Sequence, residues 1–390
     1  MKNKYRILFV GYWNVDDGLT HATIFPHLEI LKKMDSVEYL HFCNTQREGL
    51  KEVSRKKVII LSDDYTPLYS KNLPLNHLNK VYDFIQFPKL IKDLCIKHQI
   101  NFIISRGAPA GALAYLATKK LKIPFIVESF EPHAEYMKAG GTWNEYDPRY
   151  IFQKRWERRQ IKKAKALITV TQNYREALIH KGVSKERVFV VPCAINHNQF
   201  FQDNYIRNKI RDELKVTPSS ILGVYAGKFG GLYLEEEAFE IFQQVFKSIE
   251  NFELLLLTNT DKDWIKKMIE LYQLPSNRIH TRFVGYQKVN DYLNAADFAF
   301  ALYKSNEVSS FLSPVKLAEY WAVGLPVLLT PKVGDEQDWL EEKGLGVIWD
   351  NKSKKIFDHI LSYDSEKISK VGRNIRSIEI VKSTYKDILI

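Results

Sequence analysis

The sequence predicts an α/β protein of two domains, each built on a parallel β-sheet that helices cover on both faces. The chain has 390 residues, which is more than one hydrophobic core usually supports. Short apolar runs alternate with segments of helical periodicity on either side of a stretch, Asn196 to Tyr205, that has no periodicity. Such alternation is typical of parallel sheets buried on both sides.

Composition supports a globular, cytoplasmic protein. Hydrophobic residues make up 45% of the chain and charged residues 26%. No apolar run approaches 18 residues, and the N-terminus leads straight into a strand-like run, so we expect neither a spanning helix nor a signal peptide. Cys43, Cys95 and Cys193 are widely spaced and form no metal-binding pattern, so we interpret them as reduced thiols.

The first half of the chain alternates between strands and helices. Leu28, Leu31 and Met34 recur at helical spacing, for example, after a first buried strand at 6–10. The other strands expected here are 37–42, 57–61, 102–105, 125–128, 167–170 and 188–191, and the expected helices are 24–34, 87–98 and 111–120. We expect the interdomain hinge where periodicity is lost, from Asn196 to Tyr205.

The alternation restarts after this hinge. The expected strands are 221–226, 252–257, 279–284, 298–302, 327–330 and 346–349, and the expected helices are 207–214, 234–249, 264–272, 289–295, 314–322 and 368–390. The predicted domains are therefore 1–200 and 201–370, followed by a C-terminal helix at 371–390. Ligands of such folds bind at the carboxyl ends of the strands.

One stretch in the second domain, Ser313 to Asp335, predicts a binding site. Pro314 lies at a helix start, and Gly324 ends the helix before a buried strand. The free backbone N–H groups at this helix start, with Lys316 beside them, suit a diphosphate. Glu319, one turn further, suits hydroxyl groups such as those of a ribose. Ordinary helix capping explains the same pattern about as well.

The order Ser-Pro-x-Lys-Leu-x-Glu-Tyr, with Gly-x-Pro-Val five residues later, resembles the donor-site segment of family 4 glycosyltransferases. The resemblance implies a GT-B fold, in which two Rossmann-like domains face each other across a cleft and a C-terminal helix often crosses back to the first domain. It also implies retaining transfer from a nucleoside-diphosphate sugar without an obligatory metal or cofactor. The donor contacts implied in this segment are Ser313, Pro314, Val315, Lys316, Leu317 and Glu319.

The same resemblance assigns residues in four loops that follow strands. Gly18 takes the place where backbone comes near sugar and acceptor. Gly227, Lys228 and Gly230 take the place of a glycine loop whose basic residue contacts the diphosphate. His133, with Glu131 beside it, takes the place of a histidine that reaches the transferred sugar. Gly285 and Tyr286 take the place that meets the base. For Gly18 a plain turn, and for Tyr286 local packing, remain equal or better explanations.

Two positions depart from the family pattern. Tyr233 stands where a second basic residue is expected, and Phe311 where the first of two glutamates eight residues apart is expected. Glu307 is near in sequence, although a solvated acid is its simpler interpretation. These departures leave a non-catalytic GT-B binding or scaffolding protein open as an alternative, and a sugar-nucleotide epimerase of the same fold as another.

The formal charge of +11 is concentrated in one segment. Between Arg149 and Lys165 lie eight basic residues and one acid. On a helical wheel Arg155, Arg158, Arg159 and Lys162 share one side, while apolar residues fall opposite. This face either rests on an anionic membrane or is a solvated surface. No nucleic-acid-binding motif accompanies it.

Other catalytic patterns have little support. Asp261-Lys-Asp263 has the form of a metal-binding Asp-x-Asp, but its place before a helix favours capping. No zinc-binding motif, Walker loop or nucleophile elbow occurs. We therefore predict a glycosyltransferase that moves a sugar from a UDP- or GDP-sugar to a glycan or lipid-linked acceptor, in the cytoplasm or on the inner face of the membrane.

Overall fold

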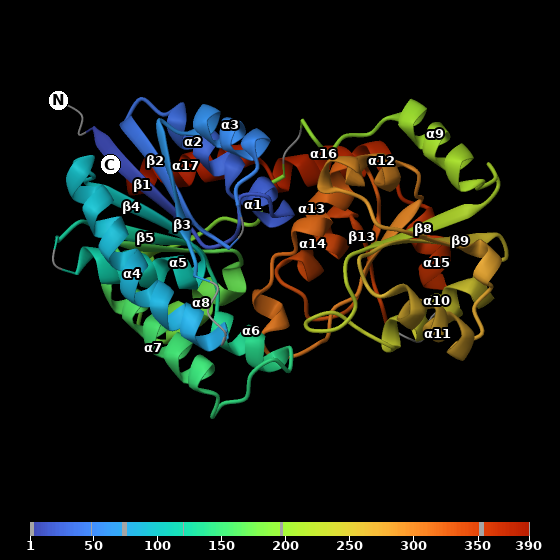
Figure 1. Ribbon diagram of the computed structural model, residues 1–390. Helices are drawn as coiled ribbons and strands as arrows, with labels where there is room; N and C mark the ends of the chain where they lie inside the picture. Colours follow the sequence, from blue (N-terminus) through green and yellow to red (C-terminus); the bar gives the residue numbers. More distant parts are fainter. Residues whose placement is uncertain are drawn as a thin grey trace. The chain divides into compact units, whose positions relative to one another are not determined.

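The computed structural model describes residues 4–47, 49–71, 76–119, 121–195, 198–350 and 355–389 (Figure 1). The chain divides into two compact units. The N-terminal unit contains residues 1–138, 143–194 and 378–390, and the C-terminal unit contains residues 139–142 and 195–377. Asn196, where the predicted hinge begins, lies outside the described residues. No helix in the described part of the chain is both long and apolar enough to cross a membrane.

The N-terminal unit is built on a parallel sheet. Its described strands, in the spatial order β3-β2-β1-β4-β5-β6-β7, number seven. Their bounds are β1 Tyr5–Gly11, β2 Val37–Gln46, β3 Asp64–Tyr69, β4 Phe102–Arg106, β5 Phe125–Phe130, β6 Ala166–Thr169 and β7 Val188–Val190. The order reverses between β1 and β4, which is where such sheets bind ligands at their carboxyl edge.

Helices cover both faces of this sheet (Figure 1). They are α1 Gly18–Thr23, α2 Phe25–Lys32, α3 Glu52–Leu61, α4 Asn76–Lys97, α5 Gly107–Thr118, α6 His133–Ala139, α7 Pro148–Lys163, α8 Gln172–His180 and, from the end of the chain, α17 Ile378–Ile388. Val381, Tyr385 and Ile388 of α17 are buried in the same core as Ile7 and Phe9 of β1. The last helix therefore belongs to the N-terminal unit.

The C-terminal unit repeats this architecture. Its described strands form a parallel sheet in the order β10-β9-β8-β11-β12-β13. The strands are β8 Ile221–Ala226, β9 Phe252–Leu257, β10 Ile279–Arg282, β11 Phe298–Ala301, β12 Val327–Leu329 and β13 Gly346–Ile348. The helices are α9 Asn204–Leu214, α10 Glu237–Ser248, α11 Lys262–Leu271, α12 Val289–Asn294, α13 Val315–Ala322, α14 Glu336–Lys343, α15 Lys355–Leu361 and α16 Ser365–Ile375. The predicted fold class, two Rossmann-like α/β domains, is confirmed.

Three predicted elements differ most from the structure in kind or extent. The apolar run 57–61, predicted as a strand, lies in helix α3, where Val58 is buried but Ile59 and Ile60 are 53% and 73% exposed. Only one side of the run meets the core, as a helix requires. The helix predicted from Phe87 begins at Asn76, because Pro88 lies inside it and does not start it. The single helix predicted at 368–390 is broken between α16 and α17.

Candidate functional site

Helix α13 brings the predicted donor residues to the carboxyl edge of the second sheet. Pro314 is its N-cap residue, with φ −65°, and no side chain caps the helix. Its buried face, which includes Leu317 and Trp321, packs into the core of the C-terminal unit. The first N–H groups of α13 consequently lack a side-chain acceptor, as an anion-binding helix end requires.

The ammonium of Lys316 lies in a cage of tyrosine rings. Its Nζ is 4.1 Å from the ring centre of Tyr233, 5.4 Å from that of Tyr225 and 5.5 Å from that of Tyr303. Burial lowers the pKa of Lys316, and the nearby Tyr233 and Glu319 oppose this effect. Among the described residues, no oxygen meets hydrogen-bond geometry with this buried nitrogen. The three N–H donors therefore have no acceptor in good hydrogen-bond geometry among the described residues, although the Tyr233 hydroxyl and the Glu319 charge partly compensate the buried ammonium.

A glycine loop faces this ammonium. Gly227 has φ +147°, and a Cβ at this position would lie 2.5 Å from Nζ of Lys316. Gly230 and Gly231 also have positive φ. The carbonyl of Lys228 accepts a hydrogen bond of 2.6 Å from the Tyr225 hydroxyl, which fixes the loop, while the Lys228 side chain is exposed. Any side chain at position 227 would displace the Lys316 ammonium.

Glu319 lies one turn along α13 and is only 8% exposed. Burial raises its pKa to about 7, although a hydrogen bond with the Tyr286 hydroxyl and the charge of Lys316 oppose the rise. The Tyr286 ring packs edge-on against Phe200, with centres 5.7 Å apart. Tyr286 thus contacts both Glu319 and Phe200, and its contact with the base stays a prediction. Gly285 is exposed, and no atom lies within 4 Å of the place that a Cβ would take there.

A buried ion pair supports the start of α13. Glu336 and Arg376 are 0% exposed and pair directly. Ser313 bonds to both: it donates to Glu336 over 2.9 Å and accepts from Arg376 over 2.6 Å. The Arg376 guanidinium also lies 5.7 Å from the Trp321 ring. The Ser313 hydroxyl, predicted as a donor contact, thus anchors the loop before α13.

The two departures from the family pattern have different surroundings. Tyr233 is part of the cage around Lys316, and its ring centre lies 4.9 Å from that of Tyr303. Phe311 is partly buried at the end of a short 3₁₀ turn, and Glu307 just before it is exposed. Tyr233 therefore does not supply a cation to the predicted site. It contacts the site through the ammonium of Lys316.

The predicted residues of the N-terminal unit lie at the carboxyl end of its sheet. His133 begins α6, its side chain is partly exposed, and its Nδ1 lies 3.9 Å from Oε1 of Glu131. Ser129, at the end of β5, has φ +46°, which is strained for a residue with a side chain. Such strain concentrates at functional positions. Gly18 is exposed and begins α1.

The C-terminal unit thus gathers Gly227, Tyr286, Lys316 and Glu319, while His133 and Gly18 belong to the other unit. Sequence reasoning did not identify Tyr225 and Tyr303 as neighbours of Lys316. The only signal was indirect: Tyr233 replaced an expected cation. Asp261, the first residue of the Asp-x-Asp pattern, caps α11 by accepting from the Trp264 N–H over 2.9 Å.

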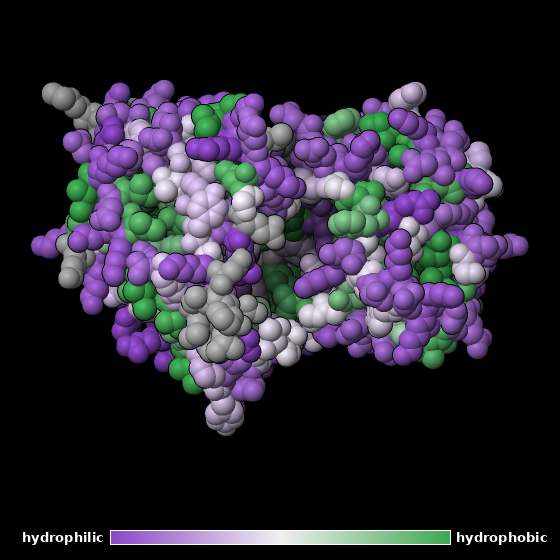
Figure 2. Space-filling model, in the orientation of Figure 1, coloured by the Kyte–Doolittle hydropathy of each residue, from purple (hydrophilic) through white to green (hydrophobic). Residues whose placement is uncertain are grey.

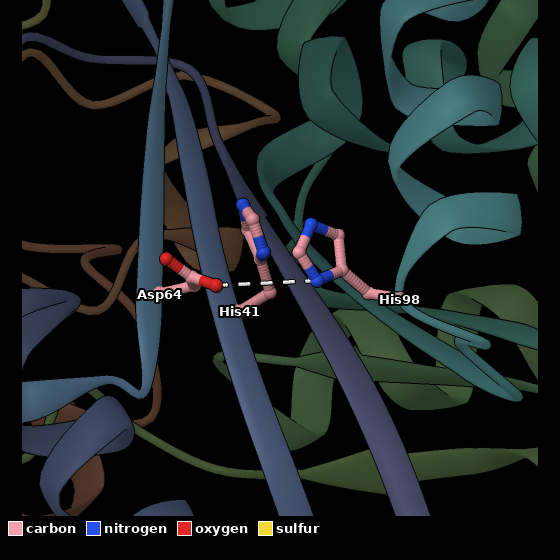
Figure 3. Close-up of side chains that lie close together, drawn as sticks. All are labelled: His41, Asp64 and His98. Atoms are coloured by element: carbon pink, nitrogen blue, oxygen red, sulfur yellow. Dashed lines mark ion pairs between the residues drawn. The ribbon is translucent and has the colours of Figure 1, made fainter.

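One group of described residues has the composition of a metal site, and it lies away from these loops. His41 of β2, Asp64 of β3 and His98 point toward one another (Figure 3). The Tyr39 hydroxyl already lies 3.2 Å from Nδ1 of His41, 3.0 Å from Oδ2 of Asp64 and 2.8 Å from Nδ1 of His98. Burial lowers the pKa of His41 to about 4. The phenol bridges all three side chains, so we interpret the cluster as a hydrogen-bonded hub.

The segment that carries the predicted basic face forms helix α7. Arg155, Arg158 and Lys162 are exposed, and the Arg159 guanidinium lies 4.8 Å from the Trp156 ring. These residues line a shallow hollow of about 480 Å³. The opposite side of α7 buries Gln153, Glu157 and Gln160 as well as Trp156, so this buried side is more polar than expected.

The pair of Rossmann-like units, with a buried cation at a helix start beside a glycine loop in the second unit, has the architecture of the GT-B fold. Residues 43–199 match the model of Glycosyltransferase Family 4. The resemblance predicted from the sequence is therefore confirmed. A comparison with curated protein sequences found no match.

Solved structures with the same fold cover nearly the whole chain. HepE of Anabaena, crystallised with UDP and glucose, is 12% identical with a TM-score of 0.69, covering 98% of each chain. A glycosyltransferase from Rickettsia africae is 15% identical with a TM-score of 0.68, covering 99% of this chain and 98% of its own. The UDP-GlcNAc 2-epimerase of Neisseria meningitidis, bound to UDP-GlcNAc, is 14% identical with a TM-score of 0.64, covering 98% and 99%.

Proposed function

We propose that this protein is a retaining glycosyltransferase that moves a sugar from a nucleoside-diphosphate sugar, with UDP as the nucleotide, to a hydroxyl of a glycan or lipid-linked acceptor. The observation that carries the proposal is the Lys316 ammonium, which is buried without a hydrogen-bond acceptor among the described residues. An unsatisfied buried cation costs stability, and a phosphate oxygen would supply both the missing acceptor and the opposite charge. UDP in the HepE and epimerase structures supports uridine as the base.

The chemistry requires stabilisation of the leaving diphosphate, which gains charge as the glycosidic bond breaks. Lys316 and the first N–H groups of α13 would bind this charge, and Lys228 would add a second, exposed cation. Glu319 would accept hydrogen bonds from the ribose hydroxyls. By the family resemblance, the leaving phosphate takes the proton of the acceptor hydroxyl, and His133 contacts the transferred sugar. No metal or cofactor enters this scheme.

A sugar-nucleotide epimerase is the second candidate, because the Neisseria epimerase shares the fold over the whole chain. The family match over residues 43–199 favours the transferase. The two reactions differ in their need for an acceptor. An epimerase changes UDP-sugar without any acceptor, whereas a transferase releases UDP at a rate that depends on acceptor concentration.

We also propose that α7 holds the protein at an anionic membrane surface. Arg155, Arg158 and Lys162 are exposed on one face of this helix, and Ile151 and Phe152 at its start are 56% and 43% exposed. Basic residues supply attraction to anionic headgroups, and exposed apolar side chains supply insertion. Such docking would give the enzyme access to a lipid-linked acceptor.

The test of the transferase proposal has two steps. Thermal-shift measurements with UDP, GDP, ADP and CDP identify the nucleotide, since a ligand at 100 times its Kd stabilises by about 2.7 kcal/mol. UDP release is then followed with a panel of UDP-sugars and acceptors. We expect Lys316→Ala and Glu319→Ala each to abolish acceptor-dependent release while circular dichroism shows an intact fold. Unchanged initial rates in either variant would refute the assigned donor site.

A further inference from the structure

The N-terminal unit has a second, larger hollow of about 980 Å³, at the same edge of the sheet as the predicted acceptor side. It opens beyond the carboxyl ends of β2 and β3: Arg47 directly follows β2, and Ser70 directly follows β3. Lys80 and Asp83 of α4 and the loop Asn144–Arg149 before α7 complete it. The carboxyl edge of a parallel sheet is where α/β proteins bind their ligands.

The hollow carries an excess of positive charge. Four cations line it, Arg47, Lys71, Lys80 and Arg149, against two acids, Asp83 and Asp147. Asp147 is engaged by Arg149, whose Nη2 lies 2.6 Å from its carboxylate, and it also accepts from the Arg149 backbone N–H as the cap of α7. Asp147 and Arg149 therefore neutralise each other within the loop.

The second acid balances only part of the remaining positive charge. Asp83 is 5% exposed, and burial raises its pKa, although a 2.7 Å hydrogen bond from Ser70 and the charges of Arg47 and Lys80 oppose the rise. Its Oδ1 has no hydrogen-bond partner among the described residues. Desolvation lowers the pKa of Lys80, and the charges of Arg47 and Arg149 lower it further. Cations that crowd together in this way repel one another unless an anion lies between them.

An exposed aromatic side chain lies beside the charges. Tyr146, in the lining itself, is 81% exposed. Phe84 of α4 and Phe152 of α7 pack edge-on at 5.1 Å, which joins the two helices. In Figure 2, hydrophobic and hydrophilic residues lie side by side over the part of the N-terminal unit where Figure 1 places α4 and α7.

We infer that this hollow binds the phosphate or diphosphate group of an acceptor that carries an apolar chain. The inference rests on the proposed transferase function and names the acceptor's chemical class. Arg47 and Lys80 would hold the anionic group, and Tyr146 would contact the chain. An uncharged glycan would leave the crowded cations without an anion, so it fits this site less well.

The probe is octyl phosphate below its micellar concentration, and octyl glucoside serves as the matched uncharged control. Both are titrated by calorimetry into protein saturated with UDP, so that the donor site is not available for phosphate. We expect octyl phosphate to bind at least tenfold more tightly than octyl glucoside. The variant Arg47→Gln with Lys80→Gln should lose at least tenfold in octyl phosphate affinity. The variant Lys119→Gln with Lys181→Gln, which removes two exposed cations elsewhere in the unit, should bind as the wild type does.

Each other outcome overturns a defined part of the inference. If the two probes bind equally, or if Arg47→Gln with Lys80→Gln retains octyl phosphate binding, the hollow is not the phosphate site. If the wild type binds anionic phosphatidylglycerol vesicles but not monomeric octyl phosphate, the charges serve a membrane surface and the acceptor assignment falls. A failure of UDP itself to bind contradicts the proposed function, and the acceptor assignment then falls with it. If UDP binds but octyl phosphate binds no more tightly than octyl glucoside, only the acceptor assignment is contradicted.

Discussion

The ammonium of Lys316 lies 4.1 Å from the centre of the Tyr233 ring, and this contact takes the place of a second cation that family 4 enzymes carry at position 233. A cation over an aromatic face is attracted by the ring quadrupole, but the ring accepts no conventional hydrogen bond. The predicted site therefore has Lys316 and Lys228 as its cations and lacks the further cation that the family pattern implies at position 233.

Lys316→Met should leave the ligand-free protein at least as stable as the wild type. Methionine keeps the apolar length that packs among the tyrosine rings and removes a buried charge without a hydrogen-bond acceptor among the described residues. Removing such a group is expected to raise the free energy of unfolding by about 1–3 kcal/mol. Differential scanning calorimetry without nucleotide measures this, with Lys228→Met as the exposed control. A markedly lower Tm for Lys316→Met would show that the ammonium stabilises the native fold.

Donor affinity should rise with pH between 6 and 8. Glu319 has a pKa of about 7 because it is buried, so it is largely protonated at pH 6. Ribose hydroxyls that donate to the carboxylate favour its charged form, and binding below pH 7 must therefore release a proton. The affinity should fall by up to about tenfold for each pH unit below 7. Titration with UDP-glucose, whose diphosphate is esterified at both ends, avoids ionisation of the ligand near this pH.

Glu319→Gln supplies the control for this pH dependence. Glutamine keeps the size of the side chain and cannot ionise. The variant should bind UDP-glucose more weakly than the wild type at pH 8, and its affinity should not change between pH 6 and 8. An equal slope in the variant would assign the pH dependence to another group.

Arg376→Met should strongly destabilise the C-terminal unit. It leaves the Glu336 carboxylate, which is 0% exposed, without its cation, and it removes the bond that holds Ser313 before α13. Breaking one partner of a buried pair costs about 3–5 kcal/mol. Urea unfolding followed by tryptophan fluorescence measures the loss. Arg373→Met on the same helix, which among the described residues loses a bond to the Phe200 carbonyl, should cost about 1 kcal/mol. If the two variants lose equal free energy of unfolding, the ion pair between Glu336 and Arg376 does not support the start of α13.

Replacement of Arg155, Arg158, Arg159 and Lys162 by Gln should weaken binding to anionic vesicles at least a hundredfold. Each basic residue near the surface adds about 1 kcal/mol, although Arg159 also packs on Trp156. Sedimentation with phosphatidylglycerol vesicles measures the effect, and phosphatidylcholine vesicles control for charge. The matched variant replaces four exposed lysines of the same unit, Lys119, Lys122, Lys181 and Lys185. Unaltered binding in the α7 variant would make this face a solvated surface.

Much of the fold could be predicted from the sequence because each domain repeats a local pattern. The central helix, predicted at 314–322, was found at Val315–Ala322, since a proline, a helix-forming run and a glycine stop act within a few residues. The run 57–61 was misassigned because an apolar stretch of five residues does not reveal whether one face or both are buried. One continuous helix was predicted at 368–390, but the helix is broken at Arg376 and Ser377. The Arg376 side chain turns inward there to pair with Glu336.

The candidate site was predictable only where its residues are neighbours in sequence. Lys316 and Glu319 lie one helical turn apart, so their shared location followed from spacing alone. The tyrosine cage combines positions 225, 233 and 303, which come together only when β8 and β11 pair. The bond between Ser313 and Arg376 joins residues 63 positions apart. Contacts of this range depend on the folded sheet, and no periodicity in one sequence encodes them.

The central claim is that Lys316 and Glu319 form the donor site for a nucleoside diphosphate. Calorimetric titration of UDP into the wild type, Lys316→Ala and Glu319→Ala tests it most directly. The account predicts saturable binding by the wild type, with a loss of at least tenfold in affinity for each variant and no loss for Lys119→Ala. Equal UDP affinity in all four proteins would contradict it.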